Sequence, residues 1–385
     1  MITNTRKIRL TFIIVSFQTG GAEIMLLRLL KHINRNIFDV SIIGLIDKGP
    51  IKKQIRDLSF PVYVAFKNYN YLFGTINLIK IIKRIKPDIV NTWMYHPDFL
   101  GGIASRIAKV PLLVWMIHQS NFILSKNNWP TYFIMRICSS LSKLMPDKIL
   151  SVSKRAAKQH IIYGYDQRKL YVIPPIVDTD NFIKNKTAKK RLCNELNIDM
   201  NSILIGLFGR FHPQKNHKTL IEAATIVNEI YPNTHFIFSG RDITYNNIVL
   251  SKLIENSNAN KFIHLLGFRK NIVDLYSSLD LYVSASSFGE AFPLVLCEAM
   301  ASEVPCVATD VGDSKYIIGN TGRIVQPNSV NQLAEGIIGL IELGNKELKR
   351  KGKISRKRII DNFQAEMIVL KYESFFSEIF NKNHH

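Results

Sequence analysis

The sequence predicts an α/β protein with two domains, each built on a parallel β-sheet. Three observations lead to this fold class. Short apolar runs alternate with helical patterns, the alternation stops at a polar, basic stretch over residues 178–191, and it then restarts. Strands separated by helices are typical of parallel βαβ units. A length of 385 residues suits two or three domains of roughly 100–200 residues each.

The elements follow in order along the chain. The first half contains candidate strands at 8–15, 40–45, 62–64, 89–91, 112–117, 148–151 and 170–173, with helical patterns at 22–33, 72–85 and 129–144. The opening run, basic and then apolar, faintly resembles a signal peptide. It lacks a small-residue cleavage site, so we interpret it as the first buried strand.

The second half repeats the alternation after the interdomain connection. Its candidate strands are 203–208, 235–239, 262–265, 281–284 and 304–308, and its helical patterns are 219–229, 248–256, 330–343, 347–360 and the amphipathic 367–380. We therefore place one domain at residues 1–183 and the other at 184–364.

Composition narrows the class of protein. A hydrophobic content of 46% supplies two large cores, and no apolar run reaches the roughly 18 residues that span a bilayer. The four cysteines, at 138, 193, 297 and 306, are scattered without the close spacing of a metal site. We expect them to be reduced core residues of a cytosolic protein.

The positive charge is concentrated in the first half. Residues 1–190 carry 30 Lys or Arg against 10 Asp or Glu, whereas residues 191–385 carry 21 against 20. This asymmetry predicts an anionic partner such as lipid headgroups, a lipid pyrophosphate or nucleic acid. A proteome-wide lysine bias would charge both halves. A second basic cluster, at 349–358, is interpreted as a solvated helix face, with an electrostatic membrane contact as the alternative.

Residues 280–313 read as strand, loop, helix and strand. Gly289 is the pivot of the loop, and Pro293 suits the first turn of the helix. Helix N-termini at this sheet edge favour anions, and ligands of open α/β sheets collect there. Glu290 and Glu298 could accept hydrogen bonds from a polyhydroxylated ligand. Two surface glutamates spaced by chance are the plain alternative.

Three further clusters are candidates for the site. Gly209, Arg210 and Lys215 follow a strand and could neutralise a pyrophosphate, although such residues are frequent at strand ends. Gly20 and Gly21 open a helix in a crowded turn, which suits either a phosphate or close packing. His118 ends the strand at 112–117, where a structural histidine is the simpler interpretation; His96 is a weaker candidate. No G-x-G-x-x-G stretch occurs, which disfavours a dinucleotide-dependent dehydrogenase.

The stretch from 280 to 325 resembles the signature of the retaining glycosyltransferases of family 4. Glu290 and Glu298 are separated by seven residues, with Gly289 before the first and Ala-Phe-Pro after it. The family's Gly-Arg-x4-Lys motif corresponds to Gly209, Arg210 and Lys215. The resemblance implies the GT-B fold, with two facing Rossmann-like domains and a last helix, within 365–385, that crosses back to the first domain.

This resemblance also implies an activity and roles for residues. We expect transfer of a hexose or N-acetylhexosamine, with retention, from a nucleotide-sugar that is expected to be UDP-linked. Arg210 and Lys215 would hold the diphosphate, Glu298 the ribose and Glu290 the donor sugar, while His118 would contact donor sugar or acceptor. Gly20 and Gly21 would line the phosphate path from the acceptor side, and the remaining donor-binding positions are Gly209, Gly289, Ala291, Phe292, Pro293 and Leu294.

No essential metal or other cofactor is expected. Asp178 and Asp180 form an Asp-x-Asp that would suit a divalent cation in another glycosyltransferase fold, but Asp178 matches a structural element of family 4. Pro175 and Ile176 depart from the family's usual Asn-Gly at this turn, so the shape of that turn is not carried over.

The expected partners are a glycan or lipid-pyrophosphate-linked acceptor and an anionic membrane surface, without nucleic acid. The predicted location is cytoplasmic, peripheral on the inner face of the cytoplasmic membrane, in synthesis of a surface polysaccharide such as lipopolysaccharide. The alternative is a basic lipid- or nucleic-acid-binding protein of the same fold without catalysis. A sugar-nucleotide epimerase or an inverting transferase is disfavoured by the glutamate motif.

Overall fold

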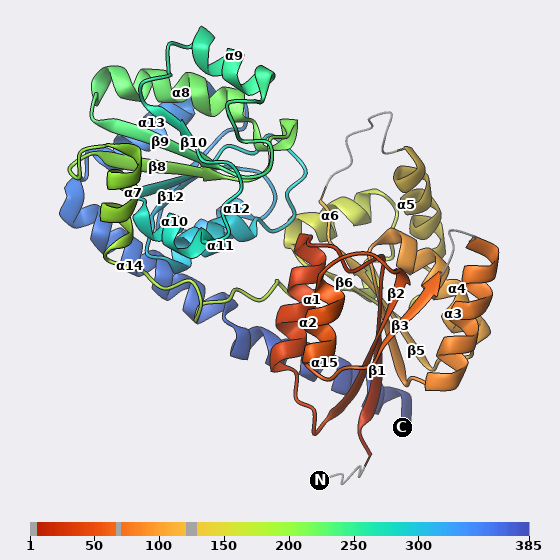
Figure 1. Ribbon diagram of the computed structural model, residues 1–385. Coiled ribbons are helices and arrows are strands. Elements are labelled where there is room, and N and C mark those ends of the chain that lie inside the picture. Colours follow the sequence, from red (N-terminus) through yellow and green to blue (C-terminus); the bar gives the residue numbers. More distant parts are fainter. Residues whose placement is uncertain (1–5, 67–70, 121–128, 385) are drawn as a thin grey trace. The chain divides into compact units, whose positions relative to one another are not determined.

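The computed structural model describes residues 6–66, 71–120 and 129–384, and the chain divides into two compact units (Figure 1). Unit 1 comprises Met1–Ile176 and Ala365–His385, and unit 2 comprises Val177–Gln364. Each unit has its own parallel sheet with helices on both faces. The predicted fold class is confirmed.

Unit 1 is built on a seven-stranded parallel sheet in the order β3-β2-β1-β4-β5-β6-β7. The strands are β1 (Ile8–Ile14), β2 (Phe38–Ile46), β3 (Val62–Phe66), β4 (Ile89–Trp93), β5 (Leu112–Ile117), β6 (Lys148–Ser151) and β7 (Leu170–Val172). All six residues of β5 are buried, because a strand covered by helices on both faces needs an apolar run rather than alternation. The strand order reverses between β1 and β4.

The helices of unit 1 come from both ends of the chain. They are α1 (Gly21–His32), α2 (Ile51–Asp57), α3 (Tyr71–Ile85), the π-helix η1 (Pro97–Gly101), α4 (Gly102–Ile107), α5 (Trp129–Leu141), α6 (Lys154–Ile162), the 3-10 helix η2 (Gln167–Lys169) and α15 (Ala365–His384). Helix α15 packs beside α1. Its buried Phe376 meets the rings of Phe12 and Phe38 edge-on, at centroid distances of 6.3 and 6.4 Å. The last helix therefore completes the core of the first unit.

Unit 2 is built on a six-stranded parallel sheet in the order β10-β9-β8-β11-β12-β13. Its strands are β8 (Ile203–Phe208), β9 (Thr234–Ser239), β10 (Ile263–Leu265), β11 (Leu281–Ser284), β12 (Cys306–Thr309) and β13 (Arg323–Val325). Its helices are α7 (Ala188–Leu196), the 3-10 helix η3 (Pro213–Lys215), α8 (His217–Ile230), α9 (Ile248–Asn256), α10 (Ile272–Ser278), α11 (Leu294–Ala301), α12 (Ser314–Ile318), α13 (Val330–Ile341) and α14 (Gly344–Phe363). The strand order reverses between β8 and β11.

The segment interpreted as a polar connection has more structure than its composition indicates. Helix α7 starts at Ala188, although its first turn is largely Lys and Arg. Val177 and Phe182 are buried in the core of unit 2, and the backbone N–H of Val177 donates to the carbonyl of Phe363 at 2.9 Å. The contacts consequently divide after residue 176, whereas the sequence places the change of domain after 183.

The basic cluster at 349–358 is only partly a solvated helix face. The Arg356 guanidinium donates to the carbonyl of Ala301, the last residue of α11, and to that of Phe182 at 2.6 Å. Arg358 Nε donates to the carbonyl of Ile317 at 2.7 Å, near the end of α12. A cation at a helix C-terminus offsets the partial negative charge of the last carbonyls. These two arginines therefore hold α14 against the ends of α11 and α12.

Candidate functional site

Two loops meet at the carboxyl edge of the sheet in unit 2. Strands β8 and β11 are paired neighbours, and their loops begin at Gly209 and Ala285. Ser287 ties the loops together, because its N–H donates to the carbonyl of Gln214 at 2.9 Å and its Oγ to that of Pro213 at 3.1 Å. This is the point where the strand order reverses, which is where open α/β sheets bind ligands.

A charged pair lies where these loops meet. Lys215 Nζ is 2.7 Å from Glu290 Oε1, and the two side chains are 18% and 13% exposed. Ser286 Oγ donates to the same carboxylate oxygen at 3.0 Å. Charge-assisted bonds in a partly buried setting fix both side chains. The structure thus brings together two residues that are 75 positions apart in the sequence.

Arg210 adds a second positive charge to the first loop. Its side chain is exposed and makes no hydrogen bond or ion pair with any residue that the structure describes. Burial, together with the charges of Arg210 and Lys215, lowers the pKa of His212 between them. The loop therefore presents two cations and a neutral imidazole, which suits a phosphate group.

Two glycines give the Glu290 loop its shape. Gly289 has a φ of +77°, a left-handed conformation that favours glycine. Gly312, which sequence reasoning did not select, has a φ of +60° and lies so close that a Cβ would stand 2.5 Å from the Glu290 carbonyl oxygen. Next to it, the N–H of Asp313 donates to the carbonyl of Ala291 at 2.9 Å. The role of Gly312 becomes visible only in the folded structure, where its backbone lies against that of Glu290.

Glu298 lies in α11, beyond the charged pair. Tyr276 OH donates to Glu298 Oε2 at 3.3 Å, and Tyr276 itself is buried on α10. Pro293 precedes the helix as its N-cap residue instead of lying in the first turn, because its ψ of 94° is extended. Leu294 is then the first helical residue, and buried Ala291 and Phe292 fix the loop from below. Tyr276 is a second residue that the sequence did not single out.

Gly209 lies directly beside Lys215. A Cβ on Gly209 would stand 3.1 Å from Lys215 Cε, so the missing side chain leaves room for the lysine to pass. Buried Tyr282 fixes the end of β8 from beneath, since its hydroxyl donates to the carbonyl of Phe208 at 3.3 Å. The cation of Lys215 is therefore held at a defined place over the sheet edge.

Unit 1 carries the other predicted residues at its own strand ends. Gly20 is the N-cap of α1 and Gly21 its first residue. The Glu23 side chain folds back toward Gly20, where a Cβ would stand 2.5 Å from Glu23 Oε2. Burial raises the pKa of this carboxyl group. The carboxyl group of Glu23 thus lies against the backbone of the turn after β1.

His118 follows β5 and packs against the ring of Trp93 in a tilted arrangement, with 37° between the ring planes. Its ring lies 4.8 Å from that of Trp93. Its Nε2 atom is buried and has no hydrogen-bond partner among the residues described here. Burial lowers the pKa of His118 to about 3, so the ring is neutral at pH 7. It can supply a neutral hydrogen bond; His96, at the start of η1, has its pKa lowered by burial as well.

No group of three His, Cys, Asp or Glu side chains that could hold a metal ion occurs within 6–66, 71–120 and 129–384. Asp178 makes a local turn, accepting from the N–H of Asn181 at 3.1 Å. In the same described ranges, no helix has the length and apolar character to cross a membrane.

Comparison with known proteins identifies the family. A model described as glycosyl transferases group 1 matches residues 188–358, and one described as Glycosyltransferase Family 4 matches residues 19–181. Together they cover most of the chain, one on each unit. The chain therefore consists of a Glycosyltransferase Family 4 domain followed by a glycosyl transferases group 1 domain.

Similar proteins come from bacterial glycan synthesis. An Escherichia coli protein named UDP-Gal:alpha-D-GlcNAc-diphosphoundecaprenol alpha-1,3-galactosyltransferase is 24% identical over 97% of both chains. The capsular polysaccharide biosynthesis glycosyltransferase CapM of Staphylococcus aureus is 24% identical over 80% of this chain and 81% of its own. The UDP complex of Anabaena HepE superposes with a TM-score of 0.84 at 22% identity, covering 96% of this chain and 100% of that one. These matches define a GT-B fold.

Proposed function

We propose that this glycosyltransferase moves a hexose or N-acetylhexosamine, with retention of configuration, from a UDP-sugar to a lipid-diphosphate-linked acceptor. The observation that carries the proposal is the Lys215–Glu290 pair, 2.7 Å apart at the reversal of strand order, with Arg210 beside it. Relatives support the substrates: HepE binds UDP and UDP-glucose, and the Escherichia coli protein is named for UDP-Gal and a diphosphoundecaprenol acceptor.

Unit 2 takes the donor in this proposal. Arg210 and Lys215 bind the diphosphate and stabilise the charge that develops on it as it leaves. Glu298, steadied by Tyr276 at 3.3 Å, accepts hydrogen bonds from the ribose. Glu290 accepts them from hydroxyls of the donor sugar, since Lys215 and Ser286 hold its carboxylate in place.

Retention is assigned to attack from the same face as the leaving group. The acceptor oxygen bonds to the anomeric carbon, the bond from that carbon to the diphosphate breaks, and the acceptor proton passes to a diphosphate oxygen. This route needs no carboxylate nucleophile and no metal cofactor. His118, neutral at pH 7, donates or accepts one hydrogen bond to donor sugar or acceptor and carries no charge through the reaction.

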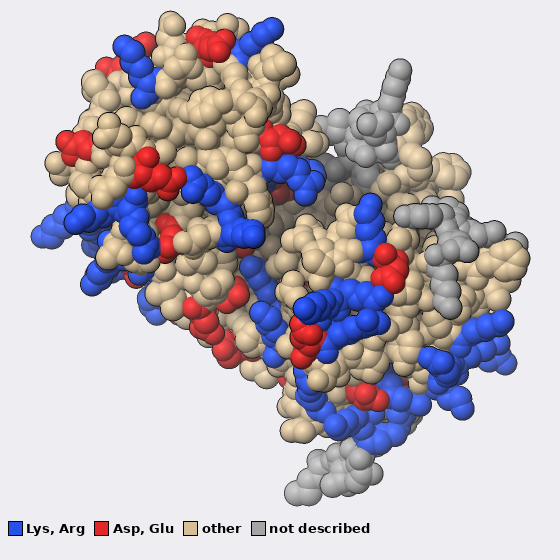
Figure 2. All heavy atoms as spheres, in the orientation of Figure 1, with Lys and Arg blue, Asp and Glu red and all other residues tan. Residues whose placement is uncertain are grey.

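A membrane surface is the proposed location, on the cytoplasmic side. Unit 1 carries 28 Lys or Arg against 11 Asp or Glu, whereas unit 2 carries 23 against 19. Figure 2 shows Lys and Arg atoms spread over the visible face of unit 1. Basic surfaces are drawn to anionic lipids by roughly 1 kcal/mol per Lys or Arg near the surface, and a lipid-linked acceptor lies in the same bilayer.

The test begins with nucleotide binding. Thermal unfolding is followed with UDP, GDP and ADP and their common sugars, with and without EDTA. At about a hundred times its dissociation constant a ligand stabilises by roughly 2.7 kcal/mol, so we expect a clear rise in Tm with UDP compounds that EDTA leaves unchanged. A rise with another nucleotide alone would reject the UDP assignment. A rise that EDTA abolishes would reject metal independence.

Transfer itself is measured with an undecaprenyl-diphosphate sugar acceptor and each UDP-sugar that binds. The anomeric configuration of the product is read by NMR. An inverted product would reject retention, and absence of transfer to any lipid-diphosphate acceptor would reject the acceptor class.

A further inference from the structure

A cavity of about 460 Å³ lies at the amino edge of the sheet in unit 2. Asp280 and Pro305 line it, and they immediately precede β11 and β12. The Lys215–Glu290 pair is at the opposite, carboxyl edge of the same sheet. The cavity is therefore separate from the candidate donor site.

Positive charge converges on this cavity from two parts of the chain. Five lysines line it, against the two carboxylates of Asp280 and Glu303; the lysines are Lys184, Lys186, Lys189, Lys349 and Lys353. Lys189 Nζ is 2.6 Å from Asp280 Oδ2, which pairs those two charges. The other four lysines have no ion pair with any residue that the structure describes. An excess of positive charge is left facing the cavity.

Lys184 is half-buried, whereas Lys186, Lys349 and Lys353 are exposed. The Nζ atom of Lys184 donates to the carbonyl of Leu279 at 3.2 Å, and burial lowers its pKa. The charges of Asp280 and Glu303 oppose this shift without forming an ion pair with Lys184, and a bound anion would offset more of the cost of removing the ammonium group from water. Met200, Leu279 and Leu348 supply apolar wall beside it.

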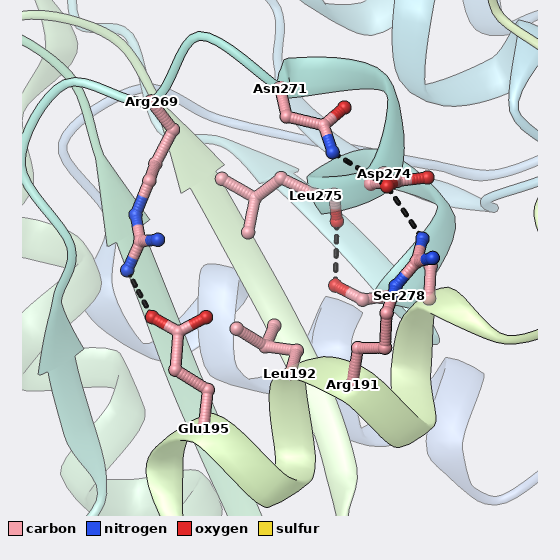
Figure 3. Close-up of a pocket in the computed structure, with 9 residues that line it drawn as sticks. Arg191, Leu192, Glu195, Arg269, Asn271, Asp274, Leu275 and Ser278 are labelled. Atoms are coloured by element: carbon pink, nitrogen blue, oxygen red, sulfur yellow. Dashed lines mark hydrogen bonds and ion pairs between the residues drawn. The ribbon is translucent and has the colours of Figure 1, made fainter.

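In a neighbouring pocket, each arginine is paired with a carboxylate. The pocket has a volume of about 190 Å³ and lies between α7 and α10 (Figure 3). Arg191 is 2.6 Å from Asp274, and Arg269 pairs with Glu195, so both arginines have carboxylate partners within the pocket. Those pairs join α7 to its neighbours and balance the charge of both guanidinium groups. Of the five lysines of the amino-edge cavity, only Lys189 has such a partner among the residues that the structure describes.

We propose that the amino-edge cavity binds a phosphate or pyrophosphate group that carries an apolar portion. Ligand sites commonly measure about 300–1,000 Å³, and 460 Å³ lies within that range. Ammonium groups bind phosphate oxygens through charge-assisted hydrogen bonds, and the apolar wall takes the attached portion. The source is either a free organophosphate or the headgroup of an anionic lipid. The site needs neither Arg210 nor Glu290 and stands independently of the proposed transferase function.

The test compares two pairs of lysines on one helix. All four lysines are exposed on α14, but Lys349 and Lys353 line the cavity one turn apart, whereas Lys346 and Lys357 do not line it. Lys357 is also 3.2 Å from Asp361 in a surface pair. K349Q/K353Q and K346Q/K357Q remove the same charge from the same helix. Both are made in an Arg210→Ala/Lys215→Ala background, so that the donor loop does not bind the probes. Thermal unfolding checks that each variant is folded.

Two kinds of probe distinguish the sources. Calorimetry measures inorganic pyrophosphate and geranyl pyrophosphate; flotation measures phosphatidylcholine vesicles with and without phosphatidylglycerol. We expect K349Q/K353Q to weaken binding about tenfold or more, since two charge-assisted contacts are lost. K346Q/K357Q should change binding less than about twofold, because neither lysine lines the cavity and solvent screens charges that lie away from it. Geranyl pyrophosphate should bind more tightly than pyrophosphate.

The outcomes separate cleanly. Loss of soluble-probe binding in K349Q/K353Q alone assigns the site to a free organophosphate. Loss confined to phosphatidylglycerol vesicles assigns it to a lipid headgroup. Equal loss in both pairs of variants, or no loss in either, overturns the proposal.

Discussion

The two units have matching sheets but different chemistry at the place where strand order reverses. In unit 2, Lys215 and Glu290 form a charged pair with Arg210 beside them. In unit 1, the turn after β1 has Gly20 and Gly21. The imidazole of His118, which follows β5, is neutral because burial lowers its pKa. One topology thus supplies two sheet edges, and the residues placed on the loops decide what each edge can bind.

The largest effect should come from breaking the charged edge of unit 2. Arg210→Ala or Glu290→Ala should lower kcat by about a hundredfold to a thousandfold, because preorganised charge at a leaving group is worth that much. The Tm should change little. Lys218→Ala is the control, since Lys218 is exposed and its one ion pair, with Glu222, is a long surface contact of 3.8 Å. Near-normal turnover in both variants would contradict the site assignment.

A smaller effect should come from the neutral edge of unit 1. His118→Asn should lower kcat/KM for the acceptor by about tenfold, the loss of one hydrogen bond of roughly 1.4 kcal/mol. The pKa of His118 is lowered to about 3 by burial, so the ring stays neutral above that pH. Wild type and variant should share one pH–rate profile shape between about pH 5 and 8. An inflection there that only the wild type shows would mean that His118 titrates during turnover.

Gly312 allows the shape of the Glu290 loop to be tested without touching a charge. Gly312→Ala places a Cβ 2.5 Å from the Glu290 carbonyl oxygen at a φ of +60°, so we expect a loss of about 2–3 kcal/mol in unfolding free energy and a several-fold loss of turnover. Gly344→Ala is the matched control, with a φ of +75° and nothing within 4 Å. It should cost only about 1 kcal/mol. Equal losses in the two variants would show that backbone strain alone is responsible.

The smallest effect concerns an ion pair in unit 1, away from either set of loops. Burial opposes ionisation of Asp88, but hydrogen bonds from Arg6 and Arg9 outweigh it and hold the pKa of Asp88 at about 2. Its stabilisation is present above the unfolded pKa of about 3.9 and is lost as the pH falls toward about 2. Asp88→Asn should therefore lower Tm at pH 7, and the difference from wild type should shrink below about pH 4.

Asp47→Asn is the control for Asp88→Asn. Asp47 also pairs with a cation, Lys52 at 2.6 Å, but its side chain is 54% exposed, against 4% for Asp88. Asp47→Asn should change Tm less, since exposed pairs contribute only about 0–1 kcal/mol. A pH-independent difference for Asp88→Asn would show that its charge does not stabilise unit 1.

Much of the fold was readable from local pattern, because buried parallel strands are continuous apolar runs between helical stretches. Strand β5 is an example, predicted with the bounds that the structure has. Short or polar elements were missed: α7 begins with a basic turn, and β13 has only three residues, of which just Val325 is buried. Their positions depend on packing partners that lie far away in the sequence.

The candidate site divides in the same way. The Gly-Arg-x4-Lys and Glu-x7-Glu strings placed Lys215 and Glu290 on strand-end loops, and parallel topology brings those loops together. Tyr276, Ser286 and Gly312 carry no local signal, since each acts through a contact that only the folded chain creates. The arginines of the 349–358 cluster also act through contacts that the sequence does not reveal. The sequence shows only that the cluster is basic, whereas the structure shows Arg356 and Arg358 donating to carbonyls at helix ends.

Helix α15 has a consequence for how the chain is made. Its buried Phe376 fills the core formed by Phe12 and Phe38, yet it is synthesised only after the whole of unit 2. Unit 2, Val177–Gln364, is complete in sequence before α15 is synthesised. Domains fold as units during synthesis, so unit 2 can reach its native state while unit 1 still lacks part of its core. A translation product that stops before α15 would lack aromatic side chains that fill part of the core of unit 1. Cellular protein quality control would therefore recognise unit 1 as incompletely folded.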